Sequence, residues 1–181
     1  MDFGSSLVTW RVIKTCNITG DVLHDSGHHN IVTDNGRALE INNLFGLGSS
    51  GIIVAMAAGA SSTAAIHTQS QLVYELIGNA SRKTLTNTSA ALLTSADIQT
   101  ISYTDGYGEP YYRKLTVQSI FNGASDGNVN QPFQEFALAT STTLPATPTS
   151  TSGVIYNRYV NASPVILTST TTITVQVSLY F

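Results

Sequence analysis

Apolar and polar residues alternate along the last stretch of the chain, from Thr170 to Phe181. Every second position carries an apolar side chain: Ile173, Val175, Val177, Leu179 and Phe181. Side chains of an extended strand point alternately to opposite faces, so this pattern predicts a strand with one apolar and one polar face. Because a single strand is not stable alone, the rest of the chain must supply partners for it in a sheet.

Similar patterns predict further strands at Leu7–Thr15, Tyr111–Asn122, Phe133–Ala139 and Val154–Val160. The segment Ile52–Ala58 is nearly all apolar, which predicts a strand buried on both faces. Glycine, asparagine and proline predict turns at Asn17–Gly20, Asp105–Pro110 and Asn161–Pro164. The segment His24–His29 is predicted as a hairpin tip.

A helix-start signal follows at Thr33, where Asp34 or Asn35 would cap the free backbone amides of the first turn. Apolar residues at helical spacing come next, and Gly46 and Gly48 end the pattern. We predict a helix of about three turns, which is close to the average helix length. Its apolar stripe is expected to lie on a sheet and consists of Leu39, Ile41, Leu44 and Phe45.

Closely spaced strands with one helix favour an antiparallel β-sandwich, jelly-roll-like, with the helix packed on a sheet. The length of 181 residues fits one domain, residues 1–181. Within it we expect an irregular segment near residues 82–110. Residues 140–152, rich in threonine, serine and proline, are predicted as a long exposed loop.

Charged residues make up only 10% of the chain, against about 25% in typical domains. The net charge of −3 and the absence of a basic run argue against non-specific electrostatic binding of nucleic acid. A surface this poor in charge predicts burial in an oligomer or assembly, although a threonine-rich soluble surface is the alternative. No stretch approaches the roughly 20 apolar residues that span a bilayer, and the N-terminus lacks the features of a signal peptide.

Few residues carry recognisable reaction chemistry. His24, His28 and His29, beside Asp25, form the one cluster that suits a metal such as zinc. Adjacent histidines point apart on an extended chain, so a solvated tip is the better interpretation and we expect no metal or cofactor. Cys16 is the only cysteine, which excludes an intrachain disulfide and a cysteine-based metal site.

Catalytic motifs are missing or out of context. Gly-x-Ser-x-Gly does not occur. Gly46-x-Gly48-x-x-Gly51 matches the dinucleotide-binding pattern, but it follows a predicted helix and precedes a strand, the reverse of the required order.

Two acid–base pairs stand among apolar neighbours: Glu135 with Arg158, and Glu75 with Arg82. A half-buried carboxylate needs a cationic partner, and arginine binds one bidentately. We therefore predict Glu135–Arg158 as a structural ion pair, with a catalytic carboxylate as the alternative.

Tyrosines surround the Asp105–Pro110 turn, at Tyr103, Tyr107, Tyr111 and Tyr112. Tyrosine combines a large contact area with a polar tip, as interfaces and sugar sites require. These tyrosines are candidate partner contacts, while ordinary sheet tyrosines are the alternative.

Several motifs occur together in one order along the chain. An Asn-Gly-Arg segment precedes the predicted helix in VTDNGRALEINNLFG at 32–46, and IIVAMAAGASSTAA follows at 52–65. A Leu-x-x-Glu-Leu motif with a following arginine occurs as QLVYEL at 71–76 and SRKTL at 81–85. A Glu-x-Gly-Leu strand and an Asn-Arg strand correspond to NQPFQEFALAT and GVIYNRYVNASPVIL, with Ala137 in place of the glycine. Together these segments resemble the tailed-bacteriophage virion structural proteins of the capsid decoration (cement) or tail-associated group.

The resemblance runs from Ile31 to the end, about four-fifths of the chain. It implies a non-enzymatic structural protein of the virion, assembled in the host cytoplasm. Capsid decoration is the favoured role because the chain is short and lacks a fibrous repeat. A tail fibre, collar or baseplate component that contacts a host glycan is the alternative. Expected partners are further copies of the chain, preferably as a trimer, and the major capsid protein, without nucleic acid or membrane.

Overall fold

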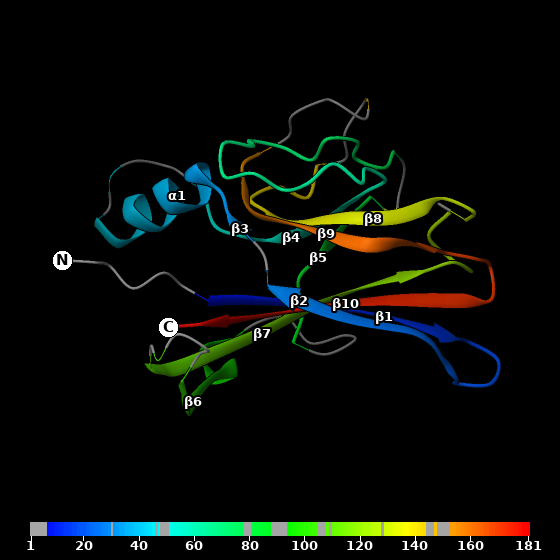
Figure 1. Cartoon of the computed structure of the whole chain (residues 1–181), viewed down its shortest axis with the longest axis horizontal. Helices are drawn as coiled ribbons and strands as arrows, with labels where there is room; N and C mark the ends of the chain where they lie inside the picture. The colour runs from blue at the N-terminus through cyan, green and yellow to red at the C-terminus, as the bar shows by residue number, and fades with distance from the viewer. Residues whose placement is uncertain are drawn as a thin grey trace.

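The computed structural model describes residues 7–29, 31–45, 47, 51–77, 81–87, 94–104, 108, 110–127, 129–143, 147 and 153–181. In these residues, two antiparallel sheets of five strands each pack face to face, and a helix lies at one end of the molecule (Figure 1). The predicted antiparallel β-sandwich with one helix is confirmed.

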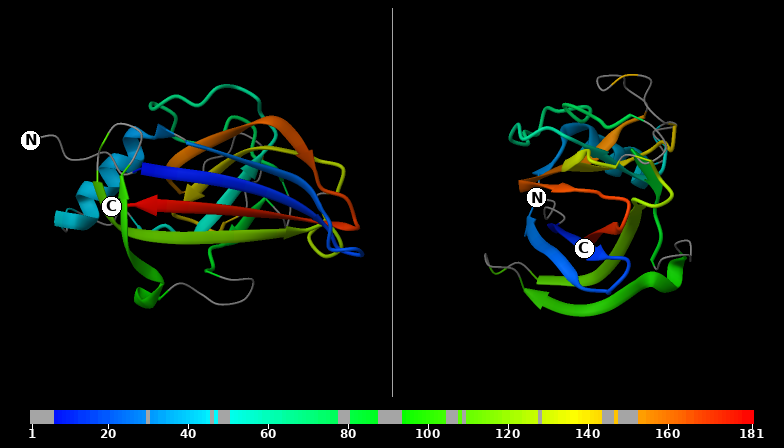
Figure 2. Two further views of the ribbon diagram at one scale, coloured as in Figure 1. Left: turned by 60° about the horizontal axis from the view of Figure 1, so that its bottom comes forward. Right: turned by 90° about the vertical axis from the view of Figure 1, so that its right-hand side faces the viewer.

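One sheet, named here the β10 sheet, has the spatial order β2 (Val22–His29), β1 (Leu7–Cys16), β10 (Thr171–Tyr180), β7 (Pro110–Asn122) and β6 (Ile98–Thr104). The other, the β9 sheet, has the order β3 (Ile31–Val32), β9 (Ile155–Ile166), β8 (Pro132–Ala139), β4 (Ala55–Gly59) and β5 (Arg82–Thr84). The helix α1 spans Asp34–Phe45, and a short 3-10 helix η1 spans Ser95–Asp97. Figure 2 shows the two sheets as separate layers.

The C-terminal strand β10 lies at the centre of its sheet, between β1 and β7. Its alternation is the one the sequence predicts, because buried and half-buried residues follow each other from Thr171 to Tyr180. Val177 pairs with Trp10 on one side and with Val117 on the other. The inward-facing residues of β1, β10 and β7 form the β10 sheet's side of the core.

Aromatic rings from both sheets meet in the middle of the sandwich. Trp10 of β1 stacks on Tyr159 of β9 with ring centroids 5.6 Å apart, and Phe136 of β8 lies 6.3 Å from the Trp10 ring. Phe133 and Phe121 continue the aromatic layer, with centroids 5.2 Å apart. Since burying a large ring removes much apolar surface from water, these contacts hold the two sheets together.

The segment His24–His29 belongs to strand β2, so its prediction as a hairpin tip is wrong. The turn lies at 17–20, and β2 runs back along β1 with Lys14 opposite His24. An unpaired β1 edge would leave a row of backbone groups without partners. Pairing with β1 therefore outweighs the turn-forming composition of Asp25, Ser26 and Gly27.

Helix α1 begins at Asp34, within the predicted start signal, and its cap is Thr33 instead of Asp34 or Asn35. The Thr33 hydroxyl accepts a hydrogen bond from the Gly36 amide at 3.0 Å and donates one to the Ile155 carbonyl at 2.9 Å. Gly36 fits tightly against β9, because a Cβ there would lie 1.9 Å from the Tyr156 carbonyl oxygen.

The predicted apolar stripe of α1 is mostly wrong. Leu39 is buried, but Ile41 and Phe45 are 53% and 63% exposed, and the side chain of Leu44 lies outside the described residues. The helix docks through its first turns on the start of β9, where the Tyr156 hydroxyl donates to the Glu40 carboxylate. Its far end therefore extends past the sheet.

Replacing Thr33 with alanine is expected to lower the free energy of unfolding by about 1–2 kcal/mol, since the helix loses its cap. Urea unfolding at fixed protein concentration measures this change, with the exposed Thr142→Ala as the matched control. An unchanged midpoint for Thr33→Ala would contradict the assignment of the cap.

Two other predictions of irregular structure are corrected. Strands β5 and β6 and the helix η1 form within residues 82–110. Strand β9 continues through the predicted turn at Asn161–Pro164, and its register against β8 shifts between Phe133 and Glu135. A bulge absorbs the extra residues without ending the strand.

Three further predictions can be compared with the structure only in part, or agree with it only in part. The apolar strand begins at Ala55, three residues later than predicted, and all its residues are buried. The turn near 105–110 lies largely outside the described residues. Of the predicted loop at 140–152, residues 142, 143 and 147 are exposed, and 144–146 and 148–152 lie outside the described residues.

Candidate functional site

The carboxylate of Glu135 lies on β8 with its side chain fully buried. Its Oε2 accepts from the Arg158 Nε at 2.8 Å and from the Val73 amide at 3.0 Å. Its Oε1 accepts from the Tyr74 amide at 2.7 Å and from the Ser61 amide at 3.3 Å. Four donors therefore surround a carboxylate that would otherwise be costly to bury.

The structure brings Arg158 and Glu135 together. Arg158 extends from the neighbouring strand β9, and its Nη2 lies 2.8 Å from Glu135 Oε2. Its Nη1 donates to the Gln69 side-chain oxygen at 3.0 Å, and the same oxygen accepts from the Ile66 amide. The guanidinium thus joins β9 and β8 to a stretch of chain more than 80 residues away in sequence.

A second buried ion pair lies nearby. Arg82 of β5 donates from Nη2 to Glu75 at 2.9 Å, and both side chains are 3% exposed. The Nη1 of Arg82 also donates to the Ser141 carbonyl at 3.0 Å. Glu75 also pairs through its backbone with Gly59, the last residue of β4, so the Glu75–Arg82 ion pair lies at the end of that strand.

Together the two pairs fasten residues 61–77, named here the covering segment, over the outer face of the β9 sheet (Figure 1). Leu72 of this segment packs on the sheet in a small cluster of buried apolar side chains, whose other members are Ala57, Ala137, Ala139 and Ile155. Gly59 is required here, because a Cβ would lie 2.5 Å from the Tyr74 carbonyl oxygen. The covering segment explains why β4 and β8 are buried on both faces.

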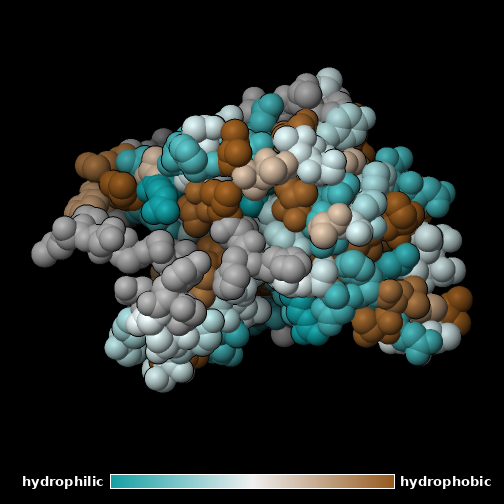
Figure 3. Space-filling view, viewed as in Figure 1, coloured by the Kyte–Doolittle hydropathy of each residue, from teal (hydrophilic) through white to brown (hydrophobic). Residues whose placement is uncertain are grey.

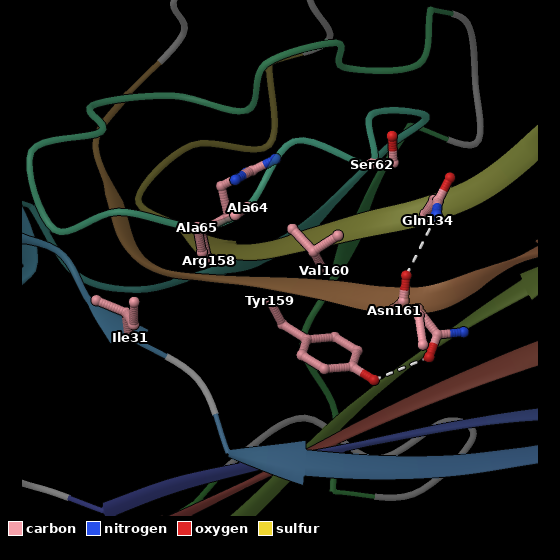
Figure 4. Close-up of a pocket in the computed structure, with 10 residues that line it drawn as sticks. Ile31, Ser62, Ala64, Ala65, Gln134, Arg158, Tyr159, Val160 and Asn161 are labelled. Atoms are coloured by element: carbon pink, nitrogen blue, oxygen red, sulfur yellow. Dashed lines mark hydrogen bonds between the residues drawn. The ribbon is translucent and has the colours of Figure 1, made fainter.

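An open pocket of about 600 Å³ lies beside β9, under one end of the covering segment (Figure 4). Its walls are mainly small or apolar, and Arg158 is the one charged residue among the described residues that line it. Since Arg158 is neutralised by Glu135, the pocket offers no uncompensated charge. Such a surface suits an uncharged partner better than an anion or a metal ion.

Asn161 connects the pocket to the edge of the other sheet. Its Oδ1 accepts from the hydroxyl of Tyr159 at 2.9 Å (Figure 4). The same oxygen accepts from the hydroxyl of Ser26, also at 2.9 Å. Burial raises the pKa of Tyr159, so the phenol stays protonated and keeps donating this bond. The Asn161 Nδ2 lies 3.3 Å from His24 Nε2, so strands β9 and β2 are linked across the seam between the sheets.

The histidine cluster expected from the sequence is only partly described. His24 takes part in the Asn161 network, whereas the side chains of His28 and His29 lie outside the described residues. Within the described residues, no group of three metal-ligating side chains comes together.

The structure brings two of the four predicted tyrosines together with Tyr180, a tyrosine that was not predicted to belong to the group. Tyr103 and Tyr111 contact Tyr180, with centroids 5.1 Å and 6.2 Å from its ring, and the Lys114 ammonium lies 5.5 Å above Tyr180. Tyr112 is 62% exposed and Tyr107 lies outside the described residues.

Sequence reasoning missed several residues of these networks. Tyr180 joins the tyrosine group through strand pairing, and no local motif marks it. Gln69 joins the Arg158 network because β9 passes beneath the covering segment, and Asn161 links the pocket to β2 because β9 also passes beside that strand. Their residue types gave no signal, because amide side chains are common throughout this chain.

Within the described residues, no helix has the length and apolarity needed to cross a membrane. Comparisons with protein-family models, with curated proteins and with solved structures found no match to this chain.

Proposed function

We propose that this chain is a non-enzymatic structural protein of a tailed-phage particle. Its role is capsid decoration: it forms a homo-oligomer, preferably a trimer, and stabilises the head by binding neighbouring subunits of the major capsid protein. The observation that carries the proposal is the gathering of exposed apolar side chains at the two ends of a chain with only 10% charged residues.

The helix-end patch consists of Ile41, Phe45 and Leu47, which are 53%, 63% and 61% exposed. The hairpin patch lies at the opposite end and consists of Ile18, Val22 and Leu23, which are 77%, 61% and 55% exposed. Figure 3 shows apolar surface over both places. Clustered apolar side chains on a soluble surface are typical of contact sites for other proteins.

The buried ion pairs support the same role. Glu135 and Glu75 accept hydrogen bonds from the fold itself, and their arginine partners lie within the same network. Their charges therefore brace the covering segment. A braced sandwich suits a protein that must resist mechanical load, because a partly satisfied network would let the segment open.

A second candidate function, glycan contact by a tail component, is favoured by one other surface. A furrow of about 260 Å³ on the outer face of the β10 sheet is lined by Thr9, Trp10, Arg11, Lys114, Thr116, Gln176 and Ser178. Hydroxyl, amide and cationic groups next to the Tyr180 ring offer the hydrogen bonds and the aromatic surface that sugars require.

Phe45→Ser is expected to weaken binding to capsids assembled without this protein by about 10–100-fold, since burial of a phenylalanine side chain contributes about 1.5–3 kcal/mol. Co-sedimentation with such capsids measures the affinity. Ile77→Ser, a residue 49% exposed outside both patches, is the matched control.

Immunogold labelling of intact particles separates the two candidate functions. Label on heads supports decoration. Label on tails, together with binding on a glycan array and no capsid binding, would overturn it in favour of the tail component.

A further inference from the structure

Strand β9 has an edge that its neighbour covers only in part. β3 pairs with Asn157 and Arg158 alone, although β9 continues to Ile166. Among the described strands, none pairs with β9 on this edge beyond Arg158. Backbone groups alternate between the two edges of a strand, so the next ones on this edge belong to Val160, and the bulge of β9 follows directly after it. An uncovered edge of this kind is a template for another strand.

The pocket follows this edge. Five consecutive residues of β9, Arg158 to Ala162, line it. Neighbouring side chains of a strand point to opposite faces, so a hollow that touches all five must run along the backbone. In Figure 4, Val160 points toward Ala64 and Ala65 of the covering segment, while Tyr159 turns to the other side of the strand.

Pro164 marks where the open edge ends. It is exposed and has no backbone N–H to donate, and proline in sheets is confined to edges and bulges. The open part of the edge is therefore short and has a defined position, between Arg158 and Pro164.

The chemistry of the pocket indicates an uncharged strand as its occupant. Arg158 is already paired with Glu135, and the other lining residues that the structure describes are uncharged. Strand β6, Ile98–Thr104, carries no charged residue and is the last strand of the β10 sheet. Its residues are exposed except for the half-buried Ile101, and no described strand pairs with its outer edge. β6 thus has both the free edge and the neutrality that the β9 pocket requires.

We propose that β6 of a second copy of this chain adds to the open edge of β9 and places an uncharged side chain in the pocket. This inference rests on the homo-oligomer part of the proposed function and names its interface. The two edges belong to different strands. Each copy therefore adds its β6 to the β9 edge of one neighbour and accepts the β6 of another neighbour at its own β9 edge. Repetition of such a head-to-tail contact closes a ring when the rotation fits, as a trimer would.

Ile98→Lys on β6 and Ala162→Lys in the pocket test the contact, because a lysine on an edge blocks strand addition. Both residues are exposed, so each variant is expected to fold, as circular dichroism can confirm. Light scattering after size-exclusion chromatography should show an oligomer for the natural protein and a monomer for each variant. Ile166→Lys, on β9 beyond Pro164 and also exposed, should leave the oligomer unchanged.

Mixing the two variants gives the sharper result. Ile98→Lys keeps an intact β9 edge and Ala162→Lys keeps an intact β6, so the mixture should form one-to-one heterodimers and no larger ring in native mass spectrometry. A mixture that stays monomeric would overturn the head-to-tail contact. A natural protein that oligomerises while both variants also do so would overturn this inference alone, whereas a natural protein that stays monomeric would overturn the homo-oligomer as well.

Discussion

Replacing Arg158 with methionine is expected to lower the free energy of unfolding by about 3–5 kcal/mol, because it leaves the Glu135 charge buried without its partner. Both side chains are fully buried, and the guanidinium also holds Gln69 of the covering segment. Methionine keeps the apolar stem and much of the volume. The loss therefore reports on the charge and its hydrogen bonds more than on a cavity.

Urea unfolding followed by the fluorescence of Trp10 measures this change, because Trp10 is the only tryptophan and is buried. Arg11→Met is the matched control, since the Arg11–Asp25 pair has exposed side chains and should contribute at most about 1 kcal/mol. The double variant Arg158→Met with Glu135→Gln should recover part of the loss, as glutamine is neutral and still accepts from the amides. A loss for Arg158→Met no larger than that of the control would contradict the bracing role.

Phe136→Ala is the second substitution with a large expected effect, a loss of about 3–5 kcal/mol in the free energy of unfolding. The Phe136 ring is fully buried and lies between the rings of Trp10, Phe133 and Tyr159, with centroids 6.3–6.5 Å away. Removing it leaves a cavity where the two sheets meet, and the rigid neighbouring rings cannot collapse fully into that space.

The same substitution on the surface provides its control. Phe45→Ala removes a ring that is 63% exposed, so its effect should stay within about 0.5 kcal/mol. Both variants are compared at one protein concentration, since oligomerisation would couple stability to concentration. Equal losses at the two positions would show that the aromatic layer is not the main contact between the sheets.

The long strands could be predicted from the chain itself. The alternation from Thr170 onward and the apolar pattern of Leu7–Thr15 reflect a face that must be buried. Among regular structures, a β-strand is the one in which side chains alternate with a period of two residues. The start of α1 was also predictable, because polar side chains before a helical pattern mark its first turn. The choice of Thr33 as the cap was not, since it depends on where β9 passes.

The candidate site was predictable only in its charged residues. Glu135 and Arg158 stood out because a charge among apolar neighbours requires a partner. Their further partners, the amides of Val73 and Tyr74 and the side chain of Gln69, lie 61 to 89 residues away in sequence. The pocket depends on the same long-range packing, and no local pattern could indicate it.

The sequence alone determined the long strands β1, β7, β8 and β10, the place where the helix starts, and which charges need a partner, because these depend on spacing and on the cost of burying polar groups. Only the tertiary structure decided that β2 runs along β1, that residues 61–77 cover the β9 sheet, and that part of the β9 edge stays open. The physical reason is that strand pairing and the closing of a covering segment depend on backbone edges, which carry the same N–H and C=O groups in almost every residue. Their partners are therefore chosen by the geometry of the whole chain.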